Sequence, residues 1–99
     1  MKFEIAPQST ERQLKWNDAK MYCFSLTIDG KTGWRLPTIE ELKEISQSEN
    51  KLLRSYYWSS EMYDDRRAWL LDVMNLNKYS FNRDDGHFHC RAVRDLKDN

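Results

Sequence analysis

The chain has 99 residues, a length that suits one domain able to bury a core without help from a metal or a disulfide. Aromatic residues make up 13% of the sequence and charged residues 32%, so the apolar material is concentrated in a few large side chains. Sixteen basic and sixteen acidic side chains cancel, which leaves no one-sided positive surface for nucleic acid. We therefore expect a single domain over residues 1–99 and no nucleic-acid partner.

The N-terminal residues, Met1 to Pro7, contain no apolar run of signal-peptide length. Nowhere in the chain is there an apolar stretch long enough to cross a bilayer. On this pattern we expect a cytoplasmic protein with no membrane partner. A mature fragment with an added Met1 would have the same pattern, so the expectation applies to a full gene product.

The first predicted elements are a short edge strand and a helix. Phe3 and Ile5 alternate with polar or small residues and Pro7 ends the run, which is typical of an edge strand. Residues 8–13 are polar and predict a loop. From about Lys15 to Leu26, apolar residues recur at steps of three and four, which predicts an amphipathic helix. The apolar positions of this helix are Trp16, Ala19, Met21, Tyr22, Cys23 and Leu26.

A complete helix-start signal follows in the segment Trp34–Leu42. Pro37 fixes its own φ angle, Thr38 can cap the first free N–H groups, and Glu41 stands three residues later, where it completes a capping box. The pattern predicts a second helix from about Thr38 to Gln47. Its apolar face is formed by Ile39, Leu42 and Ile45.

After Ser55 the pattern changes to short aromatic or β-branched runs separated by polar turns, which predicts strands. Asp85-Gly86 marks a turn before the last of these runs. Helices early in the chain and strands late predict an α+β domain. The four runs are Tyr57–Ser59, Ala68–Val73, Tyr79–Phe81 and Phe88–Val93.

Five motifs in a fixed order give the chain a family resemblance. They are Leu14–Cys23, Trp34–Leu42, Tyr57–Ser60, Ala68-Trp69 and Arg91–Arg94. Over about residues 13–95 the chain resembles the C-terminal domain family of bacterial collagen-like (Lcl-type) adhesins, a small variant of the C-type lectin fold. The resemblance implies a compact C-type lectin-like α+β domain with two helices packed on a small, mostly antiparallel sheet. The first and last strands would pair, so that the termini are adjacent.

The resemblance also bears on the two cysteines. In C-type lectin-like domains a disulfide joins the first helix to the last strand, the elements that here carry Cys23 and Cys90. The family usually places its second cysteine inside the Arg-x-Val-Arg motif, where this chain has Ala92. The two-residue shift moves the Cα by roughly 7 Å, more than disulfide geometry tolerates. We expect two buried, unbridged thiols, and a native disulfide is the alternative.

Candidate metal and catalytic groups are few. Trp16-Asn17-Asp18 spells a calcium-binding triplet of true C-type lectins, but at the start of a helix it is better explained as helix-start chemistry. His87 and His89, with Asp84 and Asp85 nearby, could form a metal site but also suit a solvated strand. The Glu-Pro-Asn type of sugar motif is absent, and no Ser/His/Asp or Cys/His signature can be assembled. We therefore expect no metal, no cofactor and no enzymatic activity.

The tryptophans and arginines within the family motifs have structural roles in this interpretation. We expect Trp34, Trp58 and Trp69 to fill the core rather than to form a sugar-stacking platform. Arg35 and Arg94 are expected to hold the structure through charge-assisted hydrogen bonds.

Recognition is therefore assigned to two segments outside the matching motifs, Glu61–Arg67 and Asn75–Asp85. Both are rich in Tyr, Arg and Asn, the residue types that carry binding energy at recognition surfaces. An ordinary solvated loop is the alternative for each. The predicted binding residues are Tyr63, Arg66, Arg67, Tyr79, Arg83 and His87.

The resulting functional hypothesis is a non-catalytic binding module of bacterial or phage origin with a protein partner. It would act as a small cytosolic adaptor, or as an inhibitor that a phage or mobile element encodes against a host protein. The alternative, by analogy with the adhesins, is a calcium-independent carbohydrate- or glycosaminoglycan-binding domain. The sequence indicates neither the ligand nor the oligomeric state.

Overall fold

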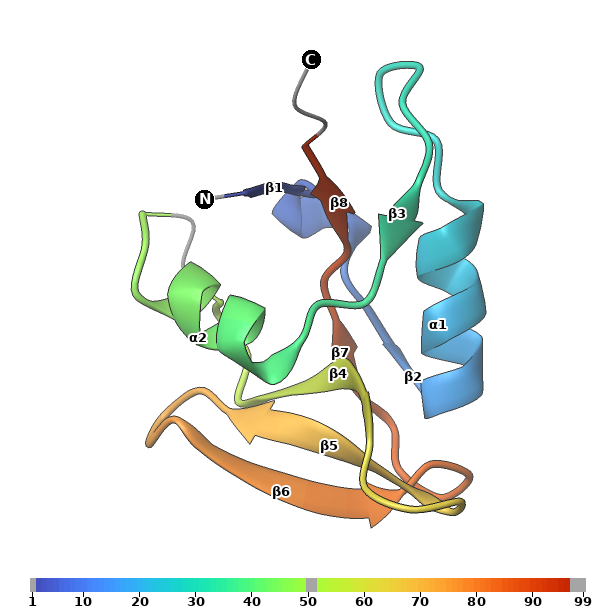
Figure 1. The fold of residues 1–99 in the computed structure, drawn as a ribbon, viewed down its shortest axis with the longest axis vertical. Helices are drawn as coiled ribbons and strands as arrows, with labels where there is room; N and C mark the ends of the chain where they lie inside the picture. Colours follow the sequence, from blue (N-terminus) through green and yellow to red (C-terminus); the bar gives the residue numbers. More distant parts are fainter. Residues whose placement is uncertain (1, 50–51, 97–99) are drawn as a thin grey trace.

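The computed structural model describes residues 2–49 and 52–96, in which helices come early and most strands late (Figure 1). The two α-helices are α1 (Trp16–Ser25) and α2 (Ile39–Ser46), and a short 3-10 helix covers Gln8–Thr10. The strands are β1 (Phe3–Ile5), β2 (Arg12–Leu14), β3 (Trp34–Arg35), β4 (Tyr56–Met62), β5 (Arg67–Asp72), β6 (Asn77–Asn82), β7 (Phe88–Cys90) and β8 (Val93–Asp95).

The strands form two sheets, with the orders β1-β8-β3 and β2-β7-β4-β5-β6. Neighbours are antiparallel except β4 and β7, which are parallel and meet at Tyr57 and His89. The prediction of an α+β domain with two helices and mostly antiparallel strands is confirmed, although the strands are divided between two sheets. The narrower assignment to a C-type lectin-like topology stays a prediction.

The pairing of the first and last strands is also confirmed. Phe3 lies opposite Asp95 and Ile5 opposite Val93 in an antiparallel ladder. At the edge of the described chain, the N–H of Leu96 donates to the carbonyl of Lys2 at 3.1 Å. The first and last strands, β1 and β8, therefore lie side by side (Figure 1).

The segment predicted as one last strand is in fact two. Phe88–Cys90 belongs to the larger sheet and Val93–Asp95 to the smaller one, so the chain crosses between sheets at Arg91 and Ala92. Both crossing residues are buried, and the Arg91 guanidinium donates from Nε to the carbonyl of Ala6 at 2.6 Å. The crossing is thus stabilised by a buried charge that a strand pattern does not reveal.

The prediction of a plain loop over residues 8–13 is wrong. The segment contains the 3-10 helix, and Arg12–Leu14 forms β2, antiparallel to β7 with Arg12 opposite Cys90. Arg12 and Gln13 are exposed and Leu14 is half-buried, so burial imposes no apolar pattern on this segment, and pairing with β7 supplies the strand geometry. Long-range pairing therefore overrides a polar local sequence.

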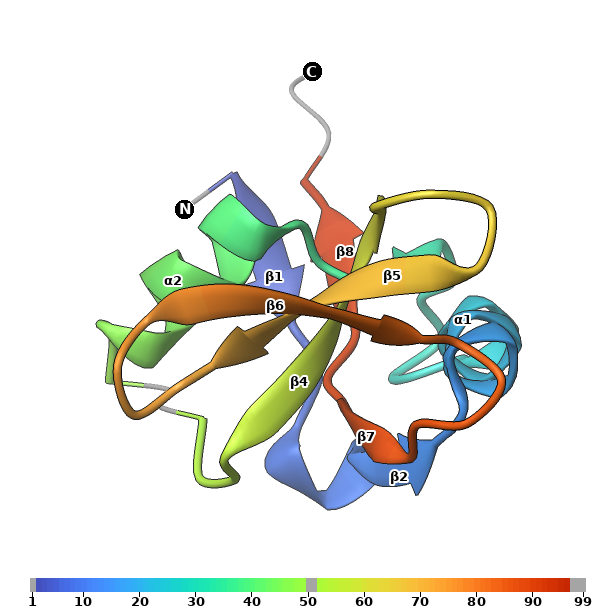
Figure 2. The same cartoon turned by 90° about the horizontal axis from the view of Figure 1, so that it is seen from below.

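Two hydrophobic clusters fill the domain, one under each helix. The α1 cluster contains Trp16, Trp34 and Trp58, and the α2 cluster contains Leu42, Ile45 and Tyr57 among others. Consecutive residues of β4 and β5 serve different clusters, because strand side chains alternate between faces: Leu70 belongs to the first and Leu71 to the second. Figure 2 shows the two helices on opposite sides of the domain.

The core roles expected for the tryptophans largely hold. Trp34 and Trp58 are buried, while Trp69 is half-buried and packs against the α2 cluster. Trp16, which the sequence assigned only to the apolar face of a helix, is buried as well.

The two cysteines are free and buried against each other. The Cys90 thiol donates to the carbonyl of Arg12 at 3.4 Å. Hydrogen bonding to Cys90, together with burial, raises the pKa of the Cys23 thiol, which is therefore protonated and unreactive at neutral pH.

We expect protein unfolded in denaturant without reductant to release two thiols that react with a chromogenic disulfide reagent. The folded protein should react slowly, because both thiols are buried and one is strongly disfavoured as a thiolate. Adding reductant should leave the melting temperature unchanged. Unfolded protein with no reactive thiol, combined with a large drop in melting temperature on reduction, would show that a disulfide is the native state.

Candidate functional site

Two of the six predicted binding residues, Tyr63 and Arg67, meet at the turn between β4 and β5. The Cζ atom of Arg67 lies 4.4 Å from the centroid of the Tyr63 ring. Arg67 also forms an ion pair with Asp64 at 2.7 Å, and hydrogen bonding from Arg67 lowers the pKa of that exposed carboxyl to about 2. The Arg67 charge is therefore already compensated within its own turn.

Two others, Arg66 and Arg83, are joined through the backbone. The N–H of Arg83 donates to the carbonyl of Arg66 at 2.9 Å, and the carbonyl of Arg83 accepts the N–H of Trp16 at 3.2 Å. The guanidinium of Arg83 lies 5.9 Å from the Trp16 ring, and its Nε is buried without a hydrogen-bond partner in the described part of the chain. Arg83 thus ties the start of α1 to the larger sheet.

Tyr79 and His87 lie elsewhere. Tyr79 pairs with Leu70 of β5, three residues from Arg67, so the two side chains point to opposite faces of the sheet. His87 is exposed, and its carbonyl accepts the Gln13 side-chain amide at 3.0 Å. Most of the segment predicted as a binding loop, Asn75–Asp85, is strand β6. The six residues do not share one hollow, and a common binding role stays a prediction.

A groove of about 700 Å³ runs along α1. One wall is a stripe of helix positions spaced by three and four residues. The other comes from β3, beside which α1 lies in Figure 1, from the residue that follows β3, and from β4. The helix contributes Asn17, Lys20, Met21, Phe24 and Ser25, and the facing wall Trp34, Arg35, Leu36 and Ser60.

The groove is bordered by two large apolar side chains that the fold does not bury. Met21 is 70% exposed and Phe24 78% exposed. The sequence analysis placed Met21 on the buried face of the helix, which is wrong. The residues of α1 that face the core are Trp16, Ala19 and Cys23, and Met21 lies about 140° around the helix from Trp16. Apolar residues occur on both sides of α1, so their spacing alone did not identify the buried side.

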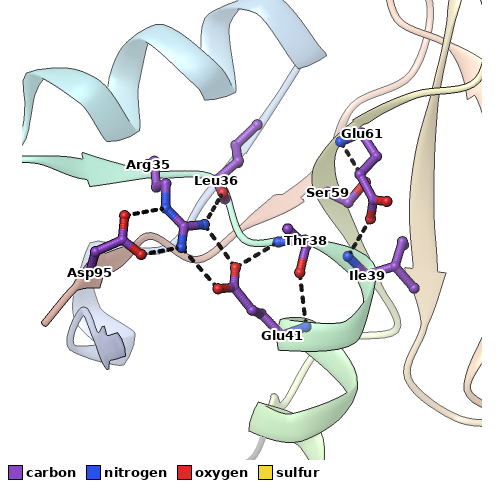
Figure 3. Close-up of polar contacts among 8 residues, drawn as sticks. All are labelled: Arg35, Leu36, Thr38, Ile39, Glu41, Ser59, Glu61 and Asp95. Atoms are coloured by element: carbon purple, nitrogen blue, oxygen red, sulfur yellow. Dashed lines mark hydrogen bonds and ion pairs between the residues drawn. The ribbon is translucent and has the colours of Figure 1, made fainter. Parts of the chain in front are cut away.

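Arg35 fixes the wall opposite the helix (Figure 3). Its guanidinium forms ion pairs with Glu41 of α2 at 2.7 Å and with Asp95 of β8 at 2.6 Å, and it donates to the Leu36 carbonyl at 3.2 Å. Hydrogen bonds from Arg35 lower the pKa of both carboxyls. Three elements are thereby held together at this wall, in agreement with the structural role expected for Arg35.

The start of α2 beneath this wall has the predicted capping box. The N–H of Glu41 donates to the Thr38 hydroxyl at 3.1 Å, and the N–H of Thr38 donates to the Glu41 carboxylate at 2.9 Å. The N–H of Ile39 donates to the Glu61 carboxylate at 2.7 Å, which joins the helix to β4 (Figure 3). These donors are satisfied by the protein itself and are not offered to an anion.

The helix wall of the groove is also anchored to the larger sheet. The indole N–H of Trp16 donates to the carbonyl of Ser59 at 2.8 Å. On the other wall, the N–H of Ser60 donates to the carbonyl of Pro37 at 2.8 Å. Since both walls are attached to β4, the groove is preformed. A preformed apolar hollow with few polar groups is the usual form of a binding site.

The chemistry available in the groove consists of apolar contact, the Asn17 amide, two serine hydroxyls and the charges of Lys20 and Arg35. Within residues 2–49 and 52–96, no three His, Cys, Asp or Glu side chains come together as a metal site. In the same ranges, every helix is too short or too polar to cross a membrane.

The model of the Lcl C-terminal domain matches residues 4–94. The chain belongs to the Lcl C-terminal domain family. The match covers every residue of the groove, and it confirms the resemblance inferred from the five motifs. No curated protein sequence matches the chain.

Glu41→Gln should weaken the fold in a pH-dependent way. The amide oxygen can still cap Thr38, but the charge facing Arg35 is lost. Because the folded-state pKa of Glu41 is lowered, its contribution is present above the unfolded-state pKa and is lost as pH falls through the folded-state value. We expect a loss of about 1 kcal/mol in the free energy of unfolding at pH 7, allowing for solvent screening.

This difference between wild type and variant should shrink below about pH 4, and denaturant unfolding across pH measures it. Glu40→Gln is the matched control, since Glu40 is exposed on the same turn and lies 3.6 Å from Lys43. The control should change the free energy of unfolding by less than about 0.5 kcal/mol. An equal, pH-independent loss in both variants would contradict a specific role for the Arg35 pair.

Proposed function

We propose that this Lcl C-terminal domain is a non-catalytic binding module that recognises a protein partner through the groove between α1 and β3. The observation that carries the proposal is the exposure of Met21 and Phe24 beside a preformed apolar hollow. Large apolar side chains that stay exposed next to a groove are typical of interaction sites. Met and Phe are also among the residue types enriched at protein interfaces.

The shape of the groove favours a peptide segment as its occupant. Its helix wall extends from Asn17 to Ser25, eight residues apart, which is about 12 Å or two turns. A segment carrying two or three apolar side chains at helical spacing would cover Met21 and Phe24. Lys20 lines the groove with its Nζ atom 5.4 Å from the centroid of the Trp16 ring, and no carboxylate among the described residues forms an ion pair with it. Arg35, by contrast, is held by two carboxylates. We therefore propose an apolar segment flanked by an acidic residue.

The groove lining supports binding rather than catalysis. Ser25 and Ser60 have no His, Asp, Glu or Cys beside them in the lining that could activate a hydroxyl. The cytoplasmic location expected from the sequence stays a prediction, and a glycan ligand remains the alternative.

The double variant Met21→Gln/Phe24→Gln should lose its partner while keeping its stability, because both side chains are exposed. We expect affinity to fall tenfold or more, the loss typical of removing central apolar anchors. The measurement is capture from bacterial lysate on the immobilised domain, followed by titration of the recovered protein. The matched control is Met74→Gln, since Met74 is 86% exposed and lies in the turn after β5.

The double variant Arg66→Ala/Arg67→Ala, in the same assay, tests the binding surface that was predicted from the sequence. If this variant loses the partner and the groove variant keeps it, the groove is not the site. Glycan-array binding that survives chelation, with no protein captured at stoichiometric amounts, would favour the carbohydrate alternative.

A further inference from the structure

A second hollow, of about 460 Å³, lies on the larger sheet and is separate from the groove. Four aromatic rings border it, and we call these residues the aromatic box: Tyr56, Tyr79, Phe81 and Phe88. Leu70 and Asp72 of β5 line the hollow between them. Tyr56 is paired with Asp72, Tyr79 with Leu70 and Phe81 with Ala68, so these side chains share one face of the sheet.

Two of the rings flank Phe88. The Tyr56 ring lies 5.8 Å from it at an angle of 66°, and the Phe81 ring lies 5.1 Å from it at 85°. Rings at such steep angles flank Phe88 instead of stacking on it. Tyr56, Tyr79 and Phe81 are 41%, 45% and 43% exposed, so each still presents ring surface to solvent.

Gly86 allows this arrangement. A Cβ atom added at Gly86 would lie 2.6 Å from Cε2 of Phe88 and 2.8 Å from Cδ1 of Phe81, closer than atoms can approach. Only a residue without a side chain lets the two rings come together there. The turn dipeptide Asp85-Gly86 therefore has a packing role in addition to its role in the turn.

The hollow can present negative charge to a ligand. The face of an aromatic ring carries negative charge, and the box adds the Asp72 carboxylate. In the described part of the chain Asp72 forms no ion pair, and its Oδ1 accepts only the N–H of Met74 at 2.9 Å. No Lys, Arg or His lines the hollow.

The neighbouring cations are directed elsewhere. The Lys78 side chain lies on the face of β6 opposite to Tyr79. Its Nζ atom is 4.4 Å from the centroid of the Trp69 ring. Arg54, His87 and His89 line a different hollow that shares Tyr56 and Phe88 with the box. The Lys78 charge, which is next to Tyr79 in sequence, therefore lies over the Trp69 ring and not in the box.

We propose that the aromatic box binds a small organic cation that carries a trimethylammonium group. Its methyl groups would bury against the rings and Leu70, and its charge would face the ring surfaces and Asp72. A bare metal ion needs several oxygen ligands, and the side chains on this face supply one carboxylate, from Asp72, and the phenol hydroxyls of Tyr56 and Tyr79. An aromatic lining with a single unpaired carboxylate matches a cation that is both charged and apolar.

The test is an NMR titration of the ¹⁵N-labelled domain with choline chloride. Its neutral isostere, 3,3-dimethylbutan-1-ol, and sodium chloride at equal ionic strength are the two comparisons. We expect choline to shift the amides around Tyr56, Asp72 and Phe88 with a Kd on the order of 1–10 mM. The neutral isostere should bind about tenfold more weakly, because it has the shape without the charge.

Variants assign the interaction to the box. Tyr79→Leu keeps an apolar side chain but removes a ring, and Asp72→Asn removes the carboxylate; each should weaken choline binding about fivefold. Tyr56→Leu is a second ring variant, and thermal unfolding verifies that each variant is folded. Lys78→Gln is the control, because Lys78 is next to Tyr79 in β6 but its side chain lies on the opposite face. This variant should leave the affinity for choline unchanged.

Three outcomes would overturn the proposal. One is equal binding of choline and the neutral alcohol, which would make the hollow merely apolar. Another is a set of choline-induced shifts that sodium chloride reproduces. The third is full choline affinity in folded Tyr79→Leu and Asp72→Asn. Choline binding is expected to persist in Met21→Gln/Phe24→Gln, so the outcome does not depend on the groove.

Discussion

The buried ion pair between Glu11 and Arg91 is the constraint on which the rest of the structure depends. Their side chains are 7% and 6% exposed, with Nη1 and Oε2 3.0 Å apart. The Tyr57 hydroxyl donates to the same carboxylate at 2.9 Å, so burial and the nearby Glu11 raise the pKa of Tyr57. Removing one partner of such a pair leaves an uncompensated charge, which typically costs about 3–5 kcal/mol. The position where the chain passes from one sheet to the other is thereby specified.

The geometry of both candidate sites depends on where the chain crosses from one sheet to the other. The strand before it, β7, pairs with β4 and supplies Phe88 to the aromatic box. The strand after it, β8, pairs with β3 and supplies Asp95 to Arg35 at the groove wall. A shift of one residue at Arg91 would turn every following side chain to the opposite face. The crossing therefore sets the register of the groove wall and of the box together.

Local features of the fold were predictable from the sequence, and long-range ones were not. The start of α2 was predicted because Thr38 and Glu41 are three residues apart and satisfy each other. Glu11 and Arg91 are 80 residues apart, and no spacing rule joins them. The predicted binding residues were selected because they lie outside the family motifs. That criterion gives no information about the ion pair between Arg67 and Asp64. Likewise, the exposure of Met21 depends on which side of α1 meets the sheets.

The aromatic residues explain why exposed apolar surface remains available for binding. The indole N–H groups of Trp16, Trp34 and Trp58 each donate to a backbone carbonyl, at 2.8, 3.0 and 2.9 Å. These buried rings fill the α1 cluster and satisfy their polar atoms within it. Phe24 and Tyr79 lie outside either cluster. Since the core is complete without them, folding places little constraint on these rings, and they remain available to the two proposed sites.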